Sequence, residues 1–184
     1  MRIIDAPALA LLLVVPVACS TSRGSTAAAT ATAAARPAGV ELPPGEVAVL
    51  VLNARGTQDY ECRPPKDGAG PNTWVFVRPE AELFDAGGQK VGTHGAGPTW
   101  ESSVDGSKVV GAVKARADAP EPDAIPWLLL SSTETSPAGT FSGIRSILRT
   151  DTHGGTPPAG ACKRAGEQLK VPYTAVYSFS RSKP

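Results

Sequence analysis

Apolar and polar residues alternate with a period of two along most of the chain after residue 40, and this period predicts β-strands rather than helices. The clearest example is residues 169–179, where Leu169, Tyr173 and Phe179 fall on the same face. Aromatic and β-branched side chains at this spacing suit a strand with one buried face. In residues 47–53 both faces are apolar, which predicts a strand in the centre of a sheet.

Turn sequences separate these strands. Asp-Gly at 105–106 and Asp-Ala-Gly-Gly at 85–88 have the composition of tight hairpin turns. Pro79 interrupts the strand before the second of these turns, so we expect an edge strand or a bulge there. A loop is expected between Asp118 and Ile125. The strands that we predict are 47–53, 74–84, 100–104, 109–115, 125–130, 144–149 and 169–179, with a short one around Val91.

The fold class expected from this pattern is all-β. About eight to ten short strands in roughly 145 residues imply a β-sandwich or a partly closed antiparallel barrel, and we favour the sandwich. The 19 glycines and 18 prolines suit a chain with many turns. No stretch carries a capped amphipathic helical pattern.

Residues 1–19 resemble an export signal. The 13 residues from Ala6 to Ala18 are apolar, too few to span a bilayer, which needs roughly 20, but enough for a signal peptide. Residues 16–19 resemble the lipobox of bacterial lipoproteins, which makes Cys19 the predicted lipidation site. Pro16 stands where that motif usually has Leu. The alternative is an ordinary secretory signal cut near Ala18.

Residues 20–39 contain only Ser, Thr, Ala, Gly, Pro and Arg. Such a segment has no bulky apolar side chain to bury, so we expect a disordered tether between the signal and a single domain at 40–184. Attached by Cys19, the domain would act in the periplasm or at the cell surface; without that lipid it would be secreted.

The chain contains three cysteines, Cys19, Cys62 and Cys162. If Cys19 carries lipid, the other two can pair without a remainder. We therefore predict a Cys62–Cys162 disulfide and an oxidising compartment, against the alternative of two free thiols.

The charge balance excludes one class of partner. The formal net charge is +1, and no stretch gathers basic residues into the patch that nucleic acid or an anionic membrane requires. We therefore expect no nucleic-acid partner and membrane contact only through Cys19. We also expect a monomer.

Familiar catalytic and cofactor motifs are absent from the sequence. With two histidines, His94 and His153, a three-histidine zinc site within one chain is excluded, and we expect no metal and no cofactor. The segment 92–101 is the first candidate site: Trp100 could stack on a sugar or aromatic ring, and Glu101 could accept hydrogen bonds. Neighbours on a strand point to opposite faces, however. In the structural alternative Trp100 is a core residue and His94 lies in an exposed turn.

The loop 149–155 is the second candidate, with Arg149 as a binding residue and His153 as a ligand, a base or a solvent-facing residue. Trp74 and Trp127 complete the predicted binding residues, since an exposed indole offers a flat apolar face.

Several segments carry a further pattern: 56–62 (Gly-Thr-Gln-Asp-Tyr-Glu-Cys), 74–85, 94–101, 105–107 with Val109 and Gly111, 125–130 (Ile-Pro-Trp-Leu-Leu-Leu) and 149–155. Together these segments resemble the domain of unknown function 3455 family. Asp59 and Asp151 depart from the residues that the family usually has at those positions. The resemblance implies a secreted or envelope-located domain of bacteria and fungi without an established activity, with Cys62 and Cys162 at the family's cysteine positions.

Two functional hypotheses follow. The first is non-catalytic binding of a glycan, a cell-wall component or another envelope protein. The alternative is an extracytoplasmic hydrolase or lyase in which Glu101 acts with His94 or His153, because acid–base catalysis needs a group that titrates near neutral pH.

Overall fold

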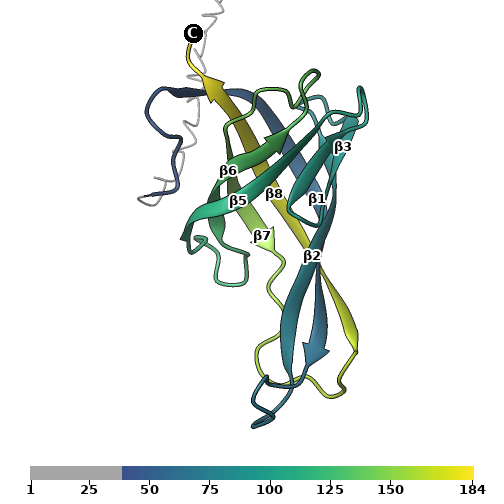
Figure 1. The fold of residues 1–184 in the computed structure, drawn as a ribbon. Helices are drawn as coiled ribbons and strands as arrows, with labels where there is room; N and C mark the ends of the chain where they lie inside the picture. The colour runs from purple at the N-terminus through teal and green to yellow at the C-terminus, as the bar shows by residue number, and fades with distance from the viewer. Residues whose placement is uncertain (1–38) are drawn as a thin grey trace, which may run out of the picture. The chain divides into compact units, whose positions relative to one another are not determined.

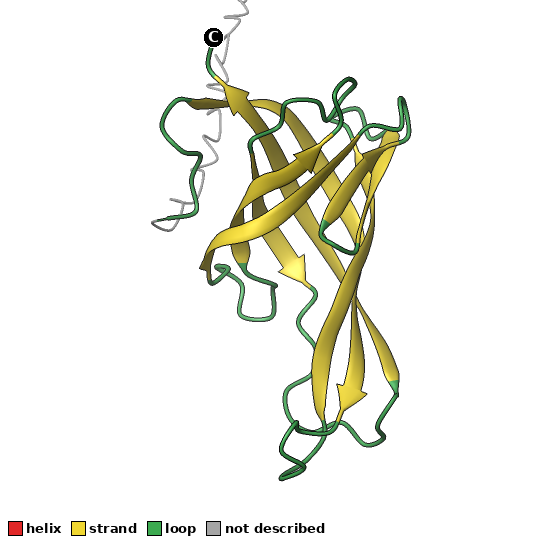
Figure 2. Ribbon diagram, viewed as in Figure 1, coloured by secondary structure: helices red, strands yellow, loops and turns green. Residues whose placement is uncertain are grey.

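The computed structural model describes residues 39–184, and this part of the chain contains eight β-strands (Figure 2). The described residues include no helix, and so none long and apolar enough to cross a membrane. The predicted signal 1–19 with Cys19, and the tether up to residue 38, lie outside the described residues. The strands are β1 (Glu46–Arg63), β2 (Thr73–Phe84), β3 (Lys90–Gly95), β4 (Thr99–Ser102), β5 (Lys108–Ala117), β6 (Trp127–Thr135), β7 (Ser146–Gly154) and β8 (Gln168–Ser182).

The strands form one closed antiparallel barrel (Figure 1). Each strand pairs with the next along the chain, and β8 returns to pair with β1 from Glu46–Ser182 to Glu61–Gln168. The predicted all-β class is therefore confirmed. Of the two architectures expected, the strands adopt the barrel, and the ring is complete because the first and last strands are hydrogen-bonded partners.

The alternation read from residues 169–179 sets the inner face of β8. Tyr173, Ala175, Tyr177 and Phe179 are all buried inside the barrel, while Thr174 is exposed. Aromatic side chains at every second position thus fill the interior from one strand.

Strand β1 is paired on both sides, as a central strand should be, but only one of its faces is buried. Leu52 and Ala54 belong to the core, whereas Val47, Val49 and Val51 are exposed by 40%, 46% and 52%. An apolar run on both faces therefore did not mean burial on both faces here.

The predicted turns lie where the sequence places them. Residues 85–89 join β2 to β3, with the Gly88 amide donating to the Asp85 carbonyl at 3.0 Å. In the β4–β5 turn the Asp105 carboxylate accepts hydrogen bonds from the side chain and backbone of Ser107 and of Thr140. These bonds hold the pKa of Asp105 well below its usual range and fasten this turn to the β6–β7 loop.

The expectation for Pro79 is also met. Pro79 pairs with Gln58 of β1, but β2 pairs with β3 only from Ala81 onward, so the first half of β2 is an edge. The register of β1 against β2 shifts between Asp59 and Tyr60, next to this position. A residue without an amide hydrogen is tolerated at such a place.

Beyond the ring, β1, β2 and β8 continue as a long extension (Figure 1). The predicted disulfide is present there: Cys62 of β1 is bonded to Cys162 of the β7–β8 loop, with a Cα–Cα distance of 5.8 Å. The Cys62 amide also donates to the Glu167 carbonyl, at 2.8 Å. The loop is thereby held against the extension.

The interior at one end of the barrel is tightly packed. Phe141 and Ile144 of the β6–β7 loop are buried there, and the Phe141 ring lies 4.9 Å from that of Phe179.

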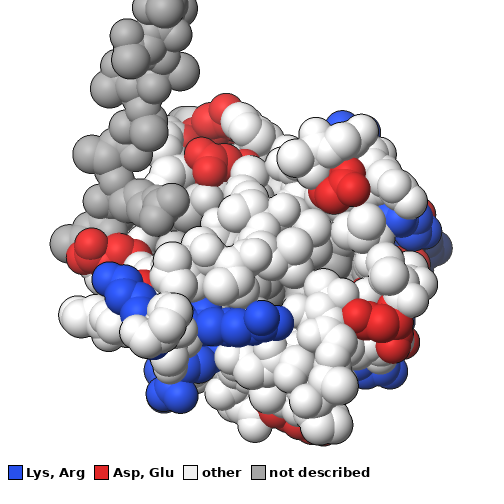
Figure 3. All heavy atoms as spheres, turned by 90° about the horizontal axis from the view of Figure 1, so that it is seen from above, with Lys and Arg blue, Asp and Glu red and all other residues white. Residues whose placement is uncertain are grey.

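Seen from above, uncharged side chains cover much of the surface and charged side chains of both signs are interspersed with them (Figure 3). A second apolar cluster, formed by Val40, Trp127 and Leu148, lies outside the ring.

Removing the disulfide should destabilise the domain without changing its fold. Cys62 and Cys162 are separated by 100 positions, and closing a loop of that length lowers the entropy of the unfolded chain. We expect the double variant Cys62→Ser, Cys162→Ser to lose up to about 4.7 kcal/mol of unfolding free energy in urea titrations. Reduced wild-type protein should match the variant. Equal stability of the oxidised protein and the variant would contradict the expectation.

Candidate functional site in the barrel interior

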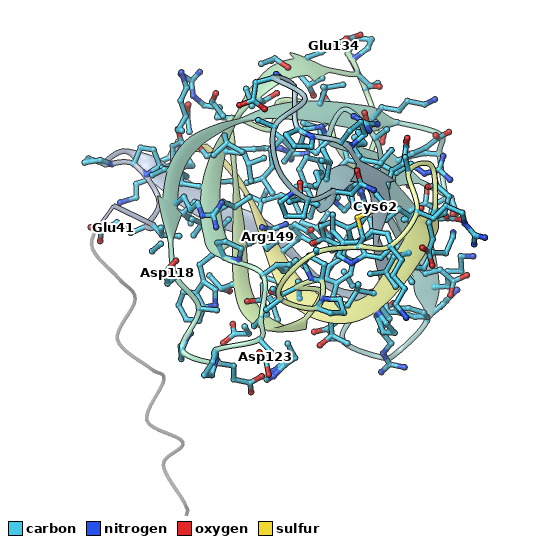
Figure 4. The ribbon with its side chains drawn as sticks, turned by 90° about the horizontal axis from the view of Figure 1, so that it is seen from below. Glu41, Cys62, Asp118, Asp123, Glu134 and Arg149 are labelled. Atoms are coloured by element: carbon cyan, nitrogen blue, oxygen red, sulfur yellow. A yellow bond between two sulfur atoms is a disulfide. The ribbon has the colours of Figure 1, made fainter. Side chains whose placement is uncertain are left out.

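The end of the barrel nearer the extension opens into a cavity of about 700 Å³. Its wall is built from β1, β2, β5, β6 and β7 together with the β3–β4 turn and the loops before β6 and after β7. The view from below looks into this end of the ring (Figure 4). A concave, mostly apolar space of this size is the usual form of a small-molecule site.

The mouth of the cavity carries large apolar side chains that are open to solvent. Phe76 and Val77 of β2 are exposed by 49% and 43%, and Val113 of β5 by 55%. The Phe76 ring meets the Tyr60 ring edge-on at 5.8 Å. Deeper in the cavity, the buried side chains of Ile125 and Leu130 continue the apolar wall.

One charged side chain, Arg149, enters this wall from β7. Ile147, two residues earlier, is buried in the core, while Leu148 between them packs outside, so the alternation of the strand directs Arg149 inward. Its Nε donates to the Pro126 carbonyl at 3.0 Å. In Figure 4 Arg149 lies within the ring, whereas Asp118 and Asp123 lie at its periphery.

Arg149 has no counter-ion among the residues that the structure describes. It forms no ion pair within 4.0 Å in residues 39–184, and the cavity wall contains no Asp or Glu. A second arginine, Arg116, stands at the mouth and is likewise without an ion pair there. The cavity therefore has a net positive lining.

Three buried polar groups near Arg149 lack hydrogen-bond partners in the described structure. They are the side-chain Nε2 of Gln58, which lines the cavity, and the hydroxyls of Tyr173 and Tyr177. Burial raises the pKa of both tyrosines, and the nearby Arg149 acts in the opposite direction. Both hydroxyls thus stay protonated at neutral pH and can donate.

Stacked aromatic side chains lie between the cavity and the packed end. The His94 ring stacks on Trp100 with centroids 4.4 Å apart and planes 11° apart, and Tyr177 meets His94 edge-on at 5.1 Å. His94 and Trp100 are register partners on β3 and β4. The Nδ1 of His94 donates to the Thr99 carbonyl at 2.9 Å.

His94 is therefore buried rather than part of an exposed turn, because the strand β3 continues through it and turns its side chain inward. Burial lowers the pKa of His94 to about 3. The imidazole is neutral at neutral pH and has no access to a proton from solvent, which is a poor setting for acid–base chemistry.

The structure does not bring the predicted catalytic residues together. Glu101 is the register partner of Thr93 and faces outward, opposite to His94 and Trp100, with its carboxylate 3.1 Å from the Lys108 Nζ. His153 is exposed on the outside of β7, where its Nδ1 lies 2.7 Å from the Glu121 carboxylate. No pair of these three side chains shares a pocket.

The predicted binding residues are also dispersed. Trp100 is 1% exposed in the aromatic stack, and Trp127 is 3% exposed in the outer cluster. Trp74 is half-buried on the extension, opposite Cys62 in the register. Of the four, Arg149 alone lines the cavity.

Sequence reasoning missed Gln58, Phe76 and Val113 as cavity residues. The sequence pattern indicates these residues only weakly. Each lies in a strand, and which face of that strand points into the barrel is known only once the closure of the ring is known. Arg149 was a predicted binding residue, but only the burial of Ile147 shows that it points inward, because the other positions of the same alternation, Arg145, Asp151 and His153, are polar.

The buried, neutral His94 should make stability depend on pH. Because its pKa in the folded state is below that of an exposed imidazole, about 6.5, the unfolded chain binds a proton that the folded chain does not. The stability it contributes is complete above about pH 6.5 and is lost as the pH falls towards 3. Carboxyl groups of the unfolded chain titrate mostly below about pH 4.5.

We expect the free energy of unfolding to fall by about 1.4 kcal/mol per pH unit between about pH 6 and 4.5. His94→Phe, which keeps a ring against Trp100, should remove most of that slope, whereas His153→Gln on the surface should keep it. Urea titrations at a series of pH values measure both. An unchanged slope in His94→Phe would show that another group is responsible.

Comparison with known proteins places the whole described domain in one family. No curated protein matches the chain. The family described as protein of unknown function DUF3455 matches residues 43–181, from before β1 to one residue before the end of β8. The match includes the cavity, the aromatic stack and both disulfide cysteines. The chain therefore belongs to the domain of unknown function 3455 family, DUF3455.

Proposed function

We propose that this domain is a non-catalytic binding protein that takes a small ligand into the open end of its barrel. The observation that carries the proposal is the cavity of about 700 Å³, which combines an exposed apolar mouth with Arg149, which has no counter-ion, and Gln58, whose Nε2 has no hydrogen-bond partner in the described structure. Ligand sites are typically apolar hollows with a few convergent polar groups that fix the orientation of the ligand.

The cavity supports binding better than the surfaces first considered. A platform for stacking on a glycan needs exposed indole faces, but Trp100 and Trp127 are buried. A hydrolase or lyase using Glu101 would need a titrating partner within hydrogen-bond reach, and neither His94 nor His153 offers one. A ligand enclosed by the barrel requires neither an exposed tryptophan nor a pair of catalytic side chains. It is therefore consistent with the positions of the tryptophans and of Glu101 and the histidines.

The place of action is part of the same proposal. The Cys62–Cys162 disulfide supports an extracytoplasmic location, because such bonds persist in oxidising compartments. The lipobox-like residues 16–19 support attachment to a membrane through lipid on Cys19, with the tether leading to the domain. The domain would then bind its ligand in the periplasm or at the cell surface.

Blocking the mouth should abolish binding of an apolar probe. Ala96, in the β3–β4 turn, is exposed and lines the mouth, so Ala96→Trp places an indole across the entrance. We expect the neutral dye N-phenylnaphthylamine to bind wild-type protein at one saturable site. Ala96→Trp should raise its Kd at least about tenfold, a change of about 1.4 kcal/mol. Fluorescence titration measures the binding.

The matched control is Ala86→Trp, the same substitution in the exposed β2–β3 turn at the other end of β3. Its Kd should equal that of the wild type. Equal binding by all three proteins, or the absence of saturable binding, would mean that the cavity is not a ligand site.

Membrane attachment depends on Cys19. In a bacterium that processes lipoproteins, we expect the full-length chain to fractionate with membranes and to incorporate labelled fatty acid. Cys19→Ser should lose the label and move to the soluble fraction, since no second anchor is proposed. A wild-type chain that is soluble and unlabelled would favour the ordinary secretory signal.

A further inference from the structure

We infer that the ligand of the cavity is an amphipathic carboxylate: a molecule with one carboxylate group, held on Arg149, and an apolar body that extends to the mouth. This inference rests on the proposed function, because it names the chemistry of the ligand for the same cavity. It is argued from the charge of the wall, the unpartnered donors and the arrangement of apolar side chains.

The charge of the wall favours an anion. Two arginines, Arg149 and Arg116, line the cavity, and no acidic residue does. Arg149 is half-buried and has no counter-ion in the described structure. A guanidinium withdrawn from water without a partner is costly, and a bound anion would offset that cost.

The donors around Arg149 fit a carboxylate. The Nε of Arg149 already donates to the Pro126 carbonyl, so the terminal Nη groups, which lie near the Tyr177 hydroxyl, face the ligand. Their planar arrangement matches the two oxygens of a carboxylate. The Nε2 of Gln58 is buried, lines the same cavity and has no acceptor, so it can supply a further hydrogen bond.

The apolar side chains define where the rest of the ligand lies. The charged end is set inside, next to Gln58, which is 3% exposed, while Phe76, Val77 and Val113 at the mouth are about half exposed. The ligand would therefore enter with its carboxylate first. Its apolar body would cover the exposed side chains of the mouth, and removing that area from water contributes to binding.

The same features disfavour other charged ligands. A phosphate monoester carries up to two charges, but only Arg149 lies inside the cavity, and Arg116 stands exposed at the mouth. A cationic amphiphile would meet a net positive wall and find no acidic partner there. One guanidinium with one amide is suited to a single carboxylate.

Two pairs of probes that differ in the head group test the inference on the full chain with its disulfide intact. The pairs are decanoate with decanol, and naphthaleneacetate with naphthaleneethanol, so that both a straight and a cyclic apolar body are sampled. By isothermal titration calorimetry at pH 7, at least one carboxylate should bind at least tenfold more tightly than its alcohol. Decylammonium should not bind.

The variants separate the role of Arg149 from a general effect on the fold. Arg149→Met should bind the carboxylate and its alcohol with the same Kd, while Arg149→Lys should retain part of the preference because it keeps the charge but not the planar fork. Arg63→Met, on the extension, is the matched control and should behave as wild type. The Tm of Arg149→Met should fall only slightly, because the Pro126 carbonyl loses one hydrogen bond but no acidic partner is left unpaired.

The outcomes distinguish this inference from the proposed function. If the neutral dye and the alcohols bind, but neither carboxylate is preferred or Arg149→Met keeps the preference, the cavity binds ligands and the inference of a carboxylate is wrong. Displacement of decanoate by millimolar inorganic phosphate would also overturn it. If neither the dye nor any probe binds, both proposals fail.

Discussion

The pairing of β1 with β8 is the interaction on which the rest of the structure depends. Without it the eight strands would form an open sheet with two long edges, each a row of unpaired amide and carbonyl groups. With it, the inner faces of all the strands enclose one space. The packed aromatic interior and the cavity are two parts of that space, so both exist only because the ring is closed.

The two ends of the enclosed space differ in how they are filled. At one end Phe141 and Phe179 pack ring against ring beside Trp100 of the aromatic stack and leave no charged group inside, although the Trp100 Nε1 has no hydrogen-bond partner in the described residues. At the other, the Nε2 of Gln58 has no hydrogen-bond partner and Arg149 has no counter-ion among the described residues. Unsatisfied buried groups cost stability, and such a cost is tolerated where the remainder of the fold is well packed and the groups serve binding.

The sequence predicted the fold more completely than the site, for physical reasons. The period of two along β8 directs Tyr173 and Phe179 inward whatever the other strands do, and the disulfide followed from a count of cysteines. The exposure of Val49 depends instead on whether another layer covers β1, and the local sequence pattern carries no information about such a layer. A cavity is a volume that side chains leave unfilled, and it emerges only when all strands are placed; hence Arg149 was a candidate but its surroundings were not foreseen.

The order of the strands also has a consequence in time. Seven of the eight pairings join consecutive strands and can form as successive hairpins, but the eighth joins β1 to β8, the two strands that lie furthest apart in the sequence, and so forms late. Until then the barrel cannot close and its interior stays accessible to water. A chain of this kind folds slowly for its size, because the pairing that completes its core is also the most distant one in the sequence.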